Sequence, residues 1–304
     1  MGGVKDVPPP PPWIGSAEEV PGYQRRVKVV PPPPPWLGSA EEVPGYQRRR
    51  FIHRHYRLEP PRLCHFYRCH NELGNMWTHV AALGFTLMRF ASWWVQVPSH
   101  SDLVWPGPLY AFGVAAFFVS SLFVFSVSIQ YHWRYCSGER EFNGWLCLDL
   151  AGCFMTLFIG FAAGIPMGFH CFPHLQKVYL TQAGVICAAM LAALVLERKR
   201  GEKVITVLGW GGISAVVPAI HFLAISEVGR NRIGLRLLLV VLCGVVAFLI
   251  YTKLWPECYA PGSFDLWGHS HQLWHIFIFL AIAQYNEALI DIFNLTASAE
   301  FCLG

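Results

Sequence analysis

From about residue 75 onward, apolar runs alternate with short polar connections, and each run has the roughly 20 residues that a helix needs to cross a bilayer. The connections hold proline, glycine and charged residues, as in the stretches 98–108 and 197–203. The pattern predicts an all-α fold, a bundle of seven transmembrane helices. Their expected positions are approximately residues 76–97, 109–133, 145–168, 175–196, 204–225, 233–254 and 267–290.

The chain ahead of these runs begins with an internal repeat. The segment 7–26 reads VPPPPPWIGSAEEVPGYQRR, and the segment 30–49 repeats it with Leu37 in place of Ile14. Five consecutive prolines favour an extended polyproline helix without internal hydrogen bonds, so we expect residues 1–50 to be a disordered, proline-rich tail. Two interpretations stand: residues 7–49 dock a proline-recognition module of the WW or profilin type, or the duplication is a spacer.

A basic, aromatic stretch connects this tail to the first apolar run. It contains RRRFIHRHYR and is expected to form a helix on an anionic cytosolic membrane face. The predicted organisation is therefore a tail over 1–50, a juxtamembrane segment over 51–74, a seven-helix domain over 75–292 and a short outer tail over 293–304. No cleavable signal peptide is expected, because residues 1–70 lack an apolar core of the needed length.

Composition supports a membrane protein and gives its orientation. The chain is 54% apolar and only 14% charged, against roughly 25% charged in soluble domains. Positive charges gather before the first span and in the loops around Arg134, Arg140, 198–203 and Lys253, which predicts a cytosolic N-terminus and an outer C-terminus. This distribution indicates membrane orientation rather than nucleic-acid binding, and it leaves open the plasma membrane or an endomembrane such as the Golgi or endoplasmic reticulum. The ten cysteines include no CxxC and no paired spacing typical of a disulfide scaffold.

Histidines at the predicted cytosolic side form the most informative constellation. His271 and His275 are one helical turn apart at the start of the seventh span, a spacing that offers two nitrogen ligands to one metal. His132 closes the second span, with Ser128 one turn before it, and Asp149 opens the third. The predicted topology brings these groups to one depth in the membrane. We therefore expect His132, His271 and His275 to bind a metal ion.

Other polar residues in the spans receive structural interpretations. His79, near the cytosolic start of the first span, is either a fourth ligand or a hydrogen-bonding residue, and the second role is favoured. His221, His170 and His174 fall near the outer side and are read as core or surface residues. Arg89 has no partner that the sequence identifies.

Three imidazoles leave one tetrahedral position of Zn²⁺ open, as in catalytic zinc sites. A water molecule there would be acidified, with Asp149 as general base and Ser128 as hydrogen-bond donor to a developing oxyanion. The chemistry would be hydrolysis of an amide or ester reached from the membrane. A structural zinc ion that ties helices together remains an equal alternative.

These residues resemble the signatures of a known family. HNELGNMWTH, the SxxxH that ends at His132 and the HxxxH that ends at His275 are similar to three motifs of the progestin and adipoQ receptor family, which is hemolysin III-related. Further similar stretches are VPGYQRRRFIHRHYR, LDLAG, VVPAIHF and APGSFDLWGHSHQLWH, so that the resemblance covers roughly residues 43–290. The SHQ ahead of His275 and the end of the chain after seven spans resemble the adiponectin-receptor branch.

The resemblance implies a seven-helix fold with a cytosolic N-terminus, zinc on His132, His271 and His275, and Asp149 binding the water on zinc. It also implies ceramidase-type hydrolysis, with a membrane lipid such as ceramide as substrate, coupled to signalling or lipid homeostasis. The family also includes non-catalytic members. A receptor with structural zinc, or a scaffold that recruits cytosolic partners through the proline-rich tail, therefore remains open, and no hormone ligand is indicated.

Overall fold

In a computed structural model of the chain, residues 33–97, 106–196 and 202–296 are described. Seven α-helices account for most of them: α1 (Leu73–Trp94), α2 (Gly107–Arg134), α3 (Glu139–Gly168), α4 (Pro173–Leu196), α5 (Glu202–Ile225), α6 (Glu227–Lys253) and α7 (Ser270–Thr296). Each helix overlaps one predicted apolar run, so the all-α prediction is confirmed. The first repeat copy and the basic cluster 198–200 lie outside the described residues.

The helices are those of an integral, multi-pass membrane protein. Six of them, α2 to α7, are long and apolar enough to cross a bilayer. The remaining helix, α1, has 22 residues and carries Asn75, His79 and Arg89 among its apolar positions. Large apolar side chains point outward along the bundle, including Leu87, Phe112, Val185, Trp210 and Leu235. An apolar exterior of this kind is the surface that lipid covers.

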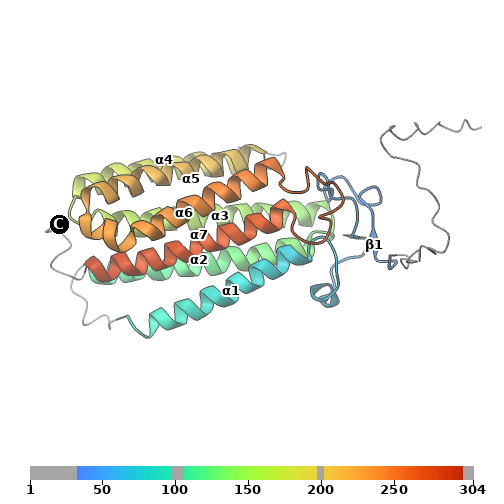
Figure 1. The fold of residues 1–304 in the computed structure, drawn as a ribbon, viewed down its shortest axis with the longest axis horizontal. Coiled ribbons are helices and arrows are strands. Elements are labelled where there is room, and N and C mark those ends of the chain that lie inside the picture. The colour runs from blue at the N-terminus through green and yellow to red at the C-terminus, as the bar shows by residue number, and fades with distance from the viewer. Residues whose placement is uncertain (1–32, 98–105, 197–201, 297–304) are drawn as a thin grey trace, which may run out of the picture. The chain divides into compact units, whose positions relative to one another are not determined.

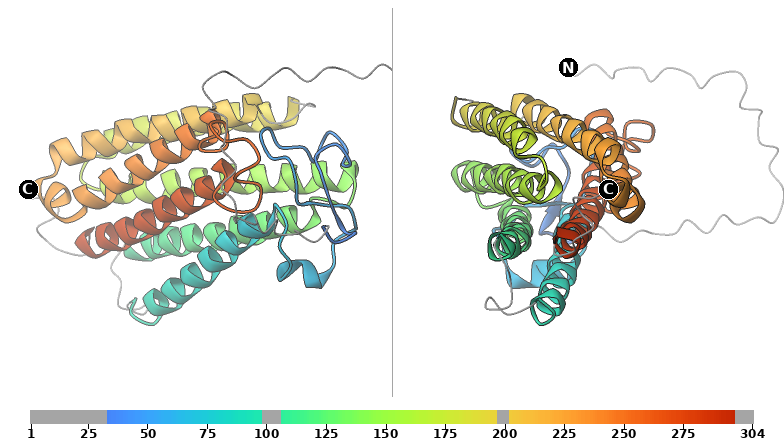
Figure 2. Two further views of the ribbon diagram at one scale, coloured as in Figure 1. Left: turned by 45° about the vertical axis from the view of Figure 1, so that its right-hand side comes forward. Right: turned by 90° about the vertical axis from the view of Figure 1, so that its left-hand side faces the viewer.

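Consecutive helices pack side by side (Figure 1). α1 also contacts α7, and α7 contacts α2 and α3 as well, so α7 lies against the centre of the bundle (Figure 2). Because neighbouring helices alternate in direction, the starts of α1, α3 and α7 and the end of α2 lie at one end. We call this the histidine end and the other the opposite end.

The N-terminal segment 33–72 folds onto the histidine end, and two predictions fail there. The basic stretch forms no α-helix: β1 (Leu37–Gly38) pairs antiparallel with β2 (Tyr56–Arg57), followed by a 3-10 helix, η1 (Leu63–Phe66). The backbone of Phe51 and His55 has φ of 67° and 68°, which an α-helix cannot contain.

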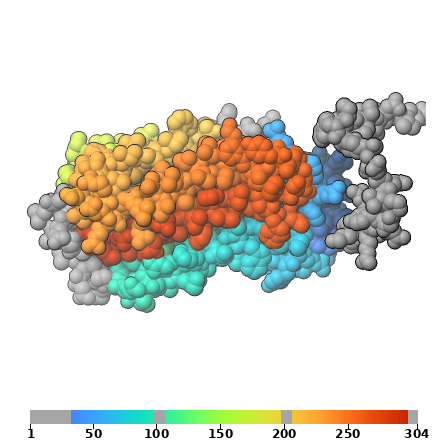
Figure 3. All heavy atoms as spheres, in the orientation of Figure 1, coloured from blue at the N-terminus to red at the C-terminus, as the bar shows by residue number. Residues whose placement is uncertain are grey.

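The second repeat copy is also not a disordered tail, because residues from Pro34 onward belong to the same compact unit as the helices. Val43, Ile52 and Tyr56 form a small buried apolar cluster. Gly262 N–H donates to the carbonyl of Phe51 at 3.0 Å, which fastens the segment to the chain ahead of α7. Figure 3 shows the blue N-terminal segment beside the orange chain that leads into α7.

One cysteine differs from the sequence-based expectation. Cys171, directly after α3 at the opposite end, is disulfide-bonded. The cysteines found free are Cys64, Cys69, Cys136, Cys147, Cys153, Cys187, Cys243 and Cys258.

Candidate metal centre

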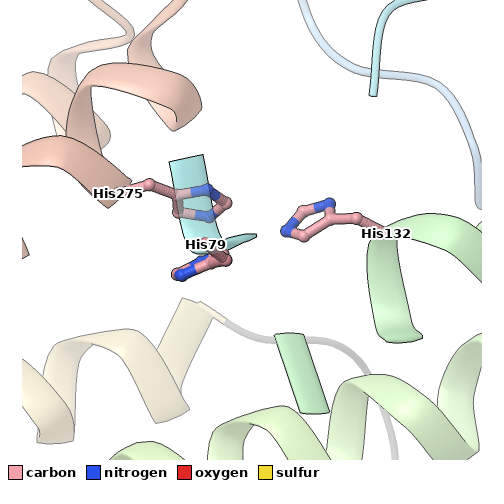
Figure 4. Close-up of side chains that lie close together, drawn as sticks. All are labelled: His79, His132 and His275. Atoms are coloured by element: carbon pink, nitrogen blue, oxygen red, sulfur yellow. The ribbon is translucent and has the colours of Figure 1, made fainter. Parts of the chain in front are cut away.

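Four histidines from three helices converge at the histidine end. His79 comes from α1, His132 from α2, and His271 and His275 from α7. Nitrogens of His79, His132 and His275 lie within 4.8 Å of one another, so this buried group could hold a metal ion. Figure 4 shows His132 reaching towards His79 and His275 from the other side.

His271 lies against the same rings. Its ring centroid is 5.2 Å from that of His132 and 4.6 Å from that of His275. The centroids of His132 and His275 are 4.9 Å apart. His79 is less evenly placed, at 3.9 Å from His275 and 6.3 Å from His132. All four imidazoles therefore border one small space.

The start of α7 is fixed by a buried carboxylate. Ser270 N–H donates to Glu257 Oε2 at 2.7 Å, and the Ser270 hydroxyl bonds to the other oxygen of Glu257. These bonds satisfy a helix N-terminus that would otherwise leave free N–H groups. They hold the first turn of α7, from which His271 and His275 extend one turn apart.

Several ring nitrogens in this space lack a partner among the described residues. They are both nitrogens of His79 and Nε2 of His132. The two side chains are buried, with 5% of His79 and none of His132 exposed. A buried polar atom without a hydrogen bond costs free energy. Converging, unpaired imidazole nitrogens fit a metal ion such as Zn²⁺, Cu²⁺ or Ni²⁺, for which imidazole is a suitable ligand.

The other nitrogens of two of these rings are occupied. Nδ1 of His132 donates to Glu72 Oε2 at 2.7 Å, which leaves Nε2 free to bind a metal. Nδ1 of His275 lies 3.1 Å from the hydroxyl of Thr78, which donates its own hydrogen to the carbonyl of Asn75. The hydroxyl oxygen therefore accepts from Nδ1 of His275, and Nε2 of that ring faces the site.

Glu72 is a fully buried carboxylate that stays ionised. Burial by itself would raise the pKa of Glu72, but the charge of Arg49 and the hydrogen bond to His132 hold it well below its ordinary value. Arg49 donates from Nε to Glu72 Oε1 at 2.8 Å and from Nη2 to Oε2 at 3.2 Å. Although burial opposes its charge, the attraction of Glu72 raises the pKa of Arg49. The Glu72 carboxylate thus lies beside His132 with its negative charge balanced by the guanidinium of Arg49.

The two predicted catalytic residues lie beside each other. The Ser128 hydroxyl of α2 lies near the Asp149 carboxylate in α3. Asp149 is also within electrostatic reach of Tyr251, whose ring centroid lies 5.7 Å from that of His271.

The remaining predicted roles have mixed outcomes. His79, for which a structural role was favoured, belongs to the group of imidazoles that could hold a metal. His221 and His170 lie away from that group and bond to tyrosines, Nδ1 of His221 to Tyr179 at 2.6 Å and Nδ1 of His170 to Tyr110 at 2.8 Å. Arg89 has a partner after all, since its Nε donates to Glu287 of α7 at 2.6 Å.

Sequence reasoning missed Glu72 and Thr78. One signal was available, since Glu72, Asn75 and His79 follow one another at intervals of three and four residues and so share a helix face. A polar stripe on a span that faces other helices marks a site. Arg49, which pairs with Glu72 of that stripe, lies in the proline-rich repeat, where no pattern in the sequence indicated a site.

Comparison with known proteins places this site in a family. The model of the haemolysin-III-related family matches residues 67–285. An adiponectin receptor protein of Drosophila melanogaster is 29% identical over 79% of this chain, and the match spans 56% of that relative. Human progestin and adipoQ receptor family member 3 is 27% identical, covering 76% of this chain and 77% of its own length. Heptahelical transmembrane protein 3 of Arabidopsis thaliana is 25% identical, covering 83% and 86%.

The chain matches just over half the length of the fly relative and larger shares of the human and plant relatives. The family match covers most of the helical domain, including His79, His132, His271 and His275. The chain therefore belongs to the haemolysin-III-related family, and its relatives include an adiponectin receptor and members of the progestin and adipoQ receptor family.

Proposed function

We propose that this protein is a seven-span, zinc-dependent lipid amidase that hydrolyses ceramide-type amides within the membrane. The observation that carries the proposal is the cluster of buried imidazoles with unpaired nitrogens at one end of the bundle. The relatives, which are named as receptors and transmembrane proteins, support the membrane location. Their names state no substrate.

The ligands proposed for Zn²⁺ are His132, His271 and His275. Three imidazoles around one tetrahedral ion, each at a Zn–N distance of about 2 Å, have ring centroids about 5 Å apart. The separations among these three rings are 4.6, 4.9 and 5.2 Å. With His79 in place of His271, the ring centroids are separated by 3.9 to 6.3 Å, so this set surrounds an ion less evenly. When bound, zinc would polarise a substrate carbonyl and acidify a coordinated water.

Asp149 and Ser128 would serve the reaction next to these ligands. The Asp149 carboxylate accepts a proton from the attacking water as general base. The hydroxyl of Ser128 would donate a hydrogen bond to developing negative charge on the substrate. Glu72 and Thr78 hold the imidazoles of His132 and His275 in the tautomers that leave Nε2 free.

The proposed topology has the histidine end at the cytosolic face. The N-terminal segment at this end holds seven of the sixteen Lys and Arg residues of the described chain, namely Arg48, Arg49, Arg50, Arg54, Arg57, Arg62 and Arg68. The disulfide-bonded Cys171 lies at the opposite end, and disulfides persist in oxidising compartments. A substrate would then enter from the lipid near the inner leaflet.

The experiment is substitution of Asp149 with Asn in the purified full chain. We expect ceramide turnover to fall about 100-fold or more, while zinc content by mass spectrometry stays near one ion per chain. Asp291→Asn, a matched change at the opposite end, should leave both values unchanged. Full turnover by Asp149→Asn would refute the proposed chemistry.

A second candidate is a receptor or scaffold in which zinc is structural. The observation that favours it is the second copy of the proline-rich repeat, which folds onto the histidine end of the bundle. Wild-type protein that binds zinc but releases no fatty acid from any ceramide would support this candidate over the amidase.

A further inference from the structure

A chain of three side chains connects the repeat to the metal centre. Arg49 is the last residue of the second repeat copy, and its guanidinium binds both oxygens of Glu72. Glu72 in turn accepts from Nδ1 of His132 at 2.7 Å. A bidentate guanidinium–carboxylate pair has a defined geometry, so the position of Arg49 determines where the carboxylate meets the imidazole.

The carboxylate of Glu72 has no freedom left. Its Oε2 also accepts from Nδ2 of Asn75 at 2.6 Å, so that every oxygen of this buried group is bonded. A buried carboxylate without its cation would be strongly unfavourable. Loss of Arg49 would therefore leave Glu72 without its bidentate partner and shift the carboxylate, which alters the bond to His132.

The N-terminal segment holds His132 through its backbone as well. Arg57 in β2 donates from Nη2 to the carbonyl of His132 at 2.7 Å and from Nη1 to the carbonyl of Trp133 at 2.9 Å. These carbonyls lie in the last turn of α2, where no helical N–H is available to them. Tyr135, one residue past α2, donates its hydroxyl hydrogen to the carbonyl of Gln47 at 3.0 Å.

We infer that Glu72 and Arg49 are positioning residues of the metal centre, and that the second repeat copy is a part of this centre through Arg49. Glu72 fixes the tautomer and direction of His132, and Arg49 fixes Glu72. A binding partner that pulled the second copy from its place would weaken metal retention. The inference rests on the metal binding of the proposed function but not on hydrolysis.

The repeat itself supplies the control for a test. Arg26 is the residue of the first copy that corresponds to Arg49, with the preceding residues Gly22–Arg25 identical to Gly45–Arg48. We would measure zinc affinity of the full chain by chelator competition for wild type, Glu72→Gln, Arg49→Gln, Arg49→Lys and Arg26→Gln. The visible absorption of Co²⁺-loaded protein would report ligand geometry, and melting temperature without metal would report the fold.

Glu72→Gln and Arg49→Gln should weaken zinc binding about 10- to 100-fold, the usual range for groups that orient a ligand, and should change the Co²⁺ spectrum. Arg49→Lys should recover part of the loss, Arg26→Gln should match wild type, and the double variant of Glu72 and Arg49 should be no weaker than Glu72→Gln alone. Wild-type affinity in folded Arg49→Gln, or equal losses in Arg26→Gln and Arg49→Gln, would overturn the inference.

Two further outcomes separate this inference from the proposed hydrolysis. If wild-type protein binds zinc but does not turn over ceramide, only the proposed amidase activity is refuted. The zinc affinities of the variants can still be compared, so the inference on Arg49 and Glu72 remains testable. Wild-type protein that binds neither zinc nor Co²⁺ defeats the inference and the metal centre together. If Glu72→Gln does not fold, the comparison of Arg49→Gln, Arg49→Lys and Arg26→Gln decides.

Discussion

The two ends of the helix bundle contain similar polar residues, but the hydrogen-bonding groups of these residues find partners in different ways. At the opposite end, polar side chains pair directly: Arg89 with Glu287, Arg236 with Asp291, Tyr110 with His170 and Tyr179 with His221. At the histidine end, both ring nitrogens of His79 and Nε2 of His132 have no partner among the described residues, although their side chains are more deeply buried. Paired polar groups stabilise a bundle in lipid, whereas unpaired and converging ones indicate that something else binds there.

The largest effect is expected when a ligand common to both possible ligand sets is removed. His132→Ala should lower zinc affinity by more than about 100-fold, because losing a ligand exceeds the loss of a group that only orients one. His221→Ala, the matched change at the opposite end, should retain about one zinc ion per chain. Metal analysis of both purified variants tests this difference between the two ends. Equal zinc loss in the two variants would contradict it.

The next prediction ranks the two candidates for the third ligand. His271→Ala should lower zinc affinity more than His79→Ala, because the ring of His271 is more evenly spaced from His132 and His275. Chelator competition on both variants decides. The reverse order would make His79 the ligand and His271 its neighbour.

At the opposite end, single substitutions should affect stability without affecting metal. Replacing Arg89 with Met leaves Glu287 unpaired at a half-buried position in the spans. An unpaired charge within a span costs on the order of 3 kcal/mol, so the melting temperature in detergent should fall while zinc content stays constant. The double change to Met at both positions should restore much of the loss. A double variant less stable than either single one would contradict this explanation.

A smaller effect concerns pH and the N-terminal segment. His70 is buried as the neutral form, since its Nε2 donates to the carbonyl of His65 and its Nδ1 accepts from Glu72 N–H. Burial lowers the pKa of His70 to about 3. As the pH falls, His70 therefore takes up a proton in the unfolded chain before it does so in the folded chain. Its contribution to the free energy of unfolding is fully present above about pH 6.5 and declines as the pH falls towards 3.

By pH 5.5 the loss from His70 should be about 1.4 kcal/mol. His70→Gln, which does not titrate, should therefore melt with a shallower dependence on pH between 6.5 and 4.5 than wild type. The difference between the two proteins isolates His70 from the histidines of the metal centre. Parallel curves would show that His70 is not protonated on unfolding.

Local pattern accounts for much of what was predicted. Hydropathy placed seven helices because a span must be apolar over its whole length, whatever it packs against. The spacing of His271 and His275 placed two imidazoles on one face of α7, and chain alternation brought His132 to the same end. Ionisable residues in apolar runs are informative, since each needs a physical reason to be there.

The sequence by itself determined the seven helices, their alternating directions and the end at which the histidines gather, because hydropathy and helical periodicity are properties of neighbouring residues. Only the tertiary structure decided that the second repeat copy folds against the helices, that His79 joins the cluster, and that Arg49 holds Glu72 against His132. Those contacts join residues 23 and 60 positions apart. Their energies come from burial and charge pairing, which arise only when separate segments meet.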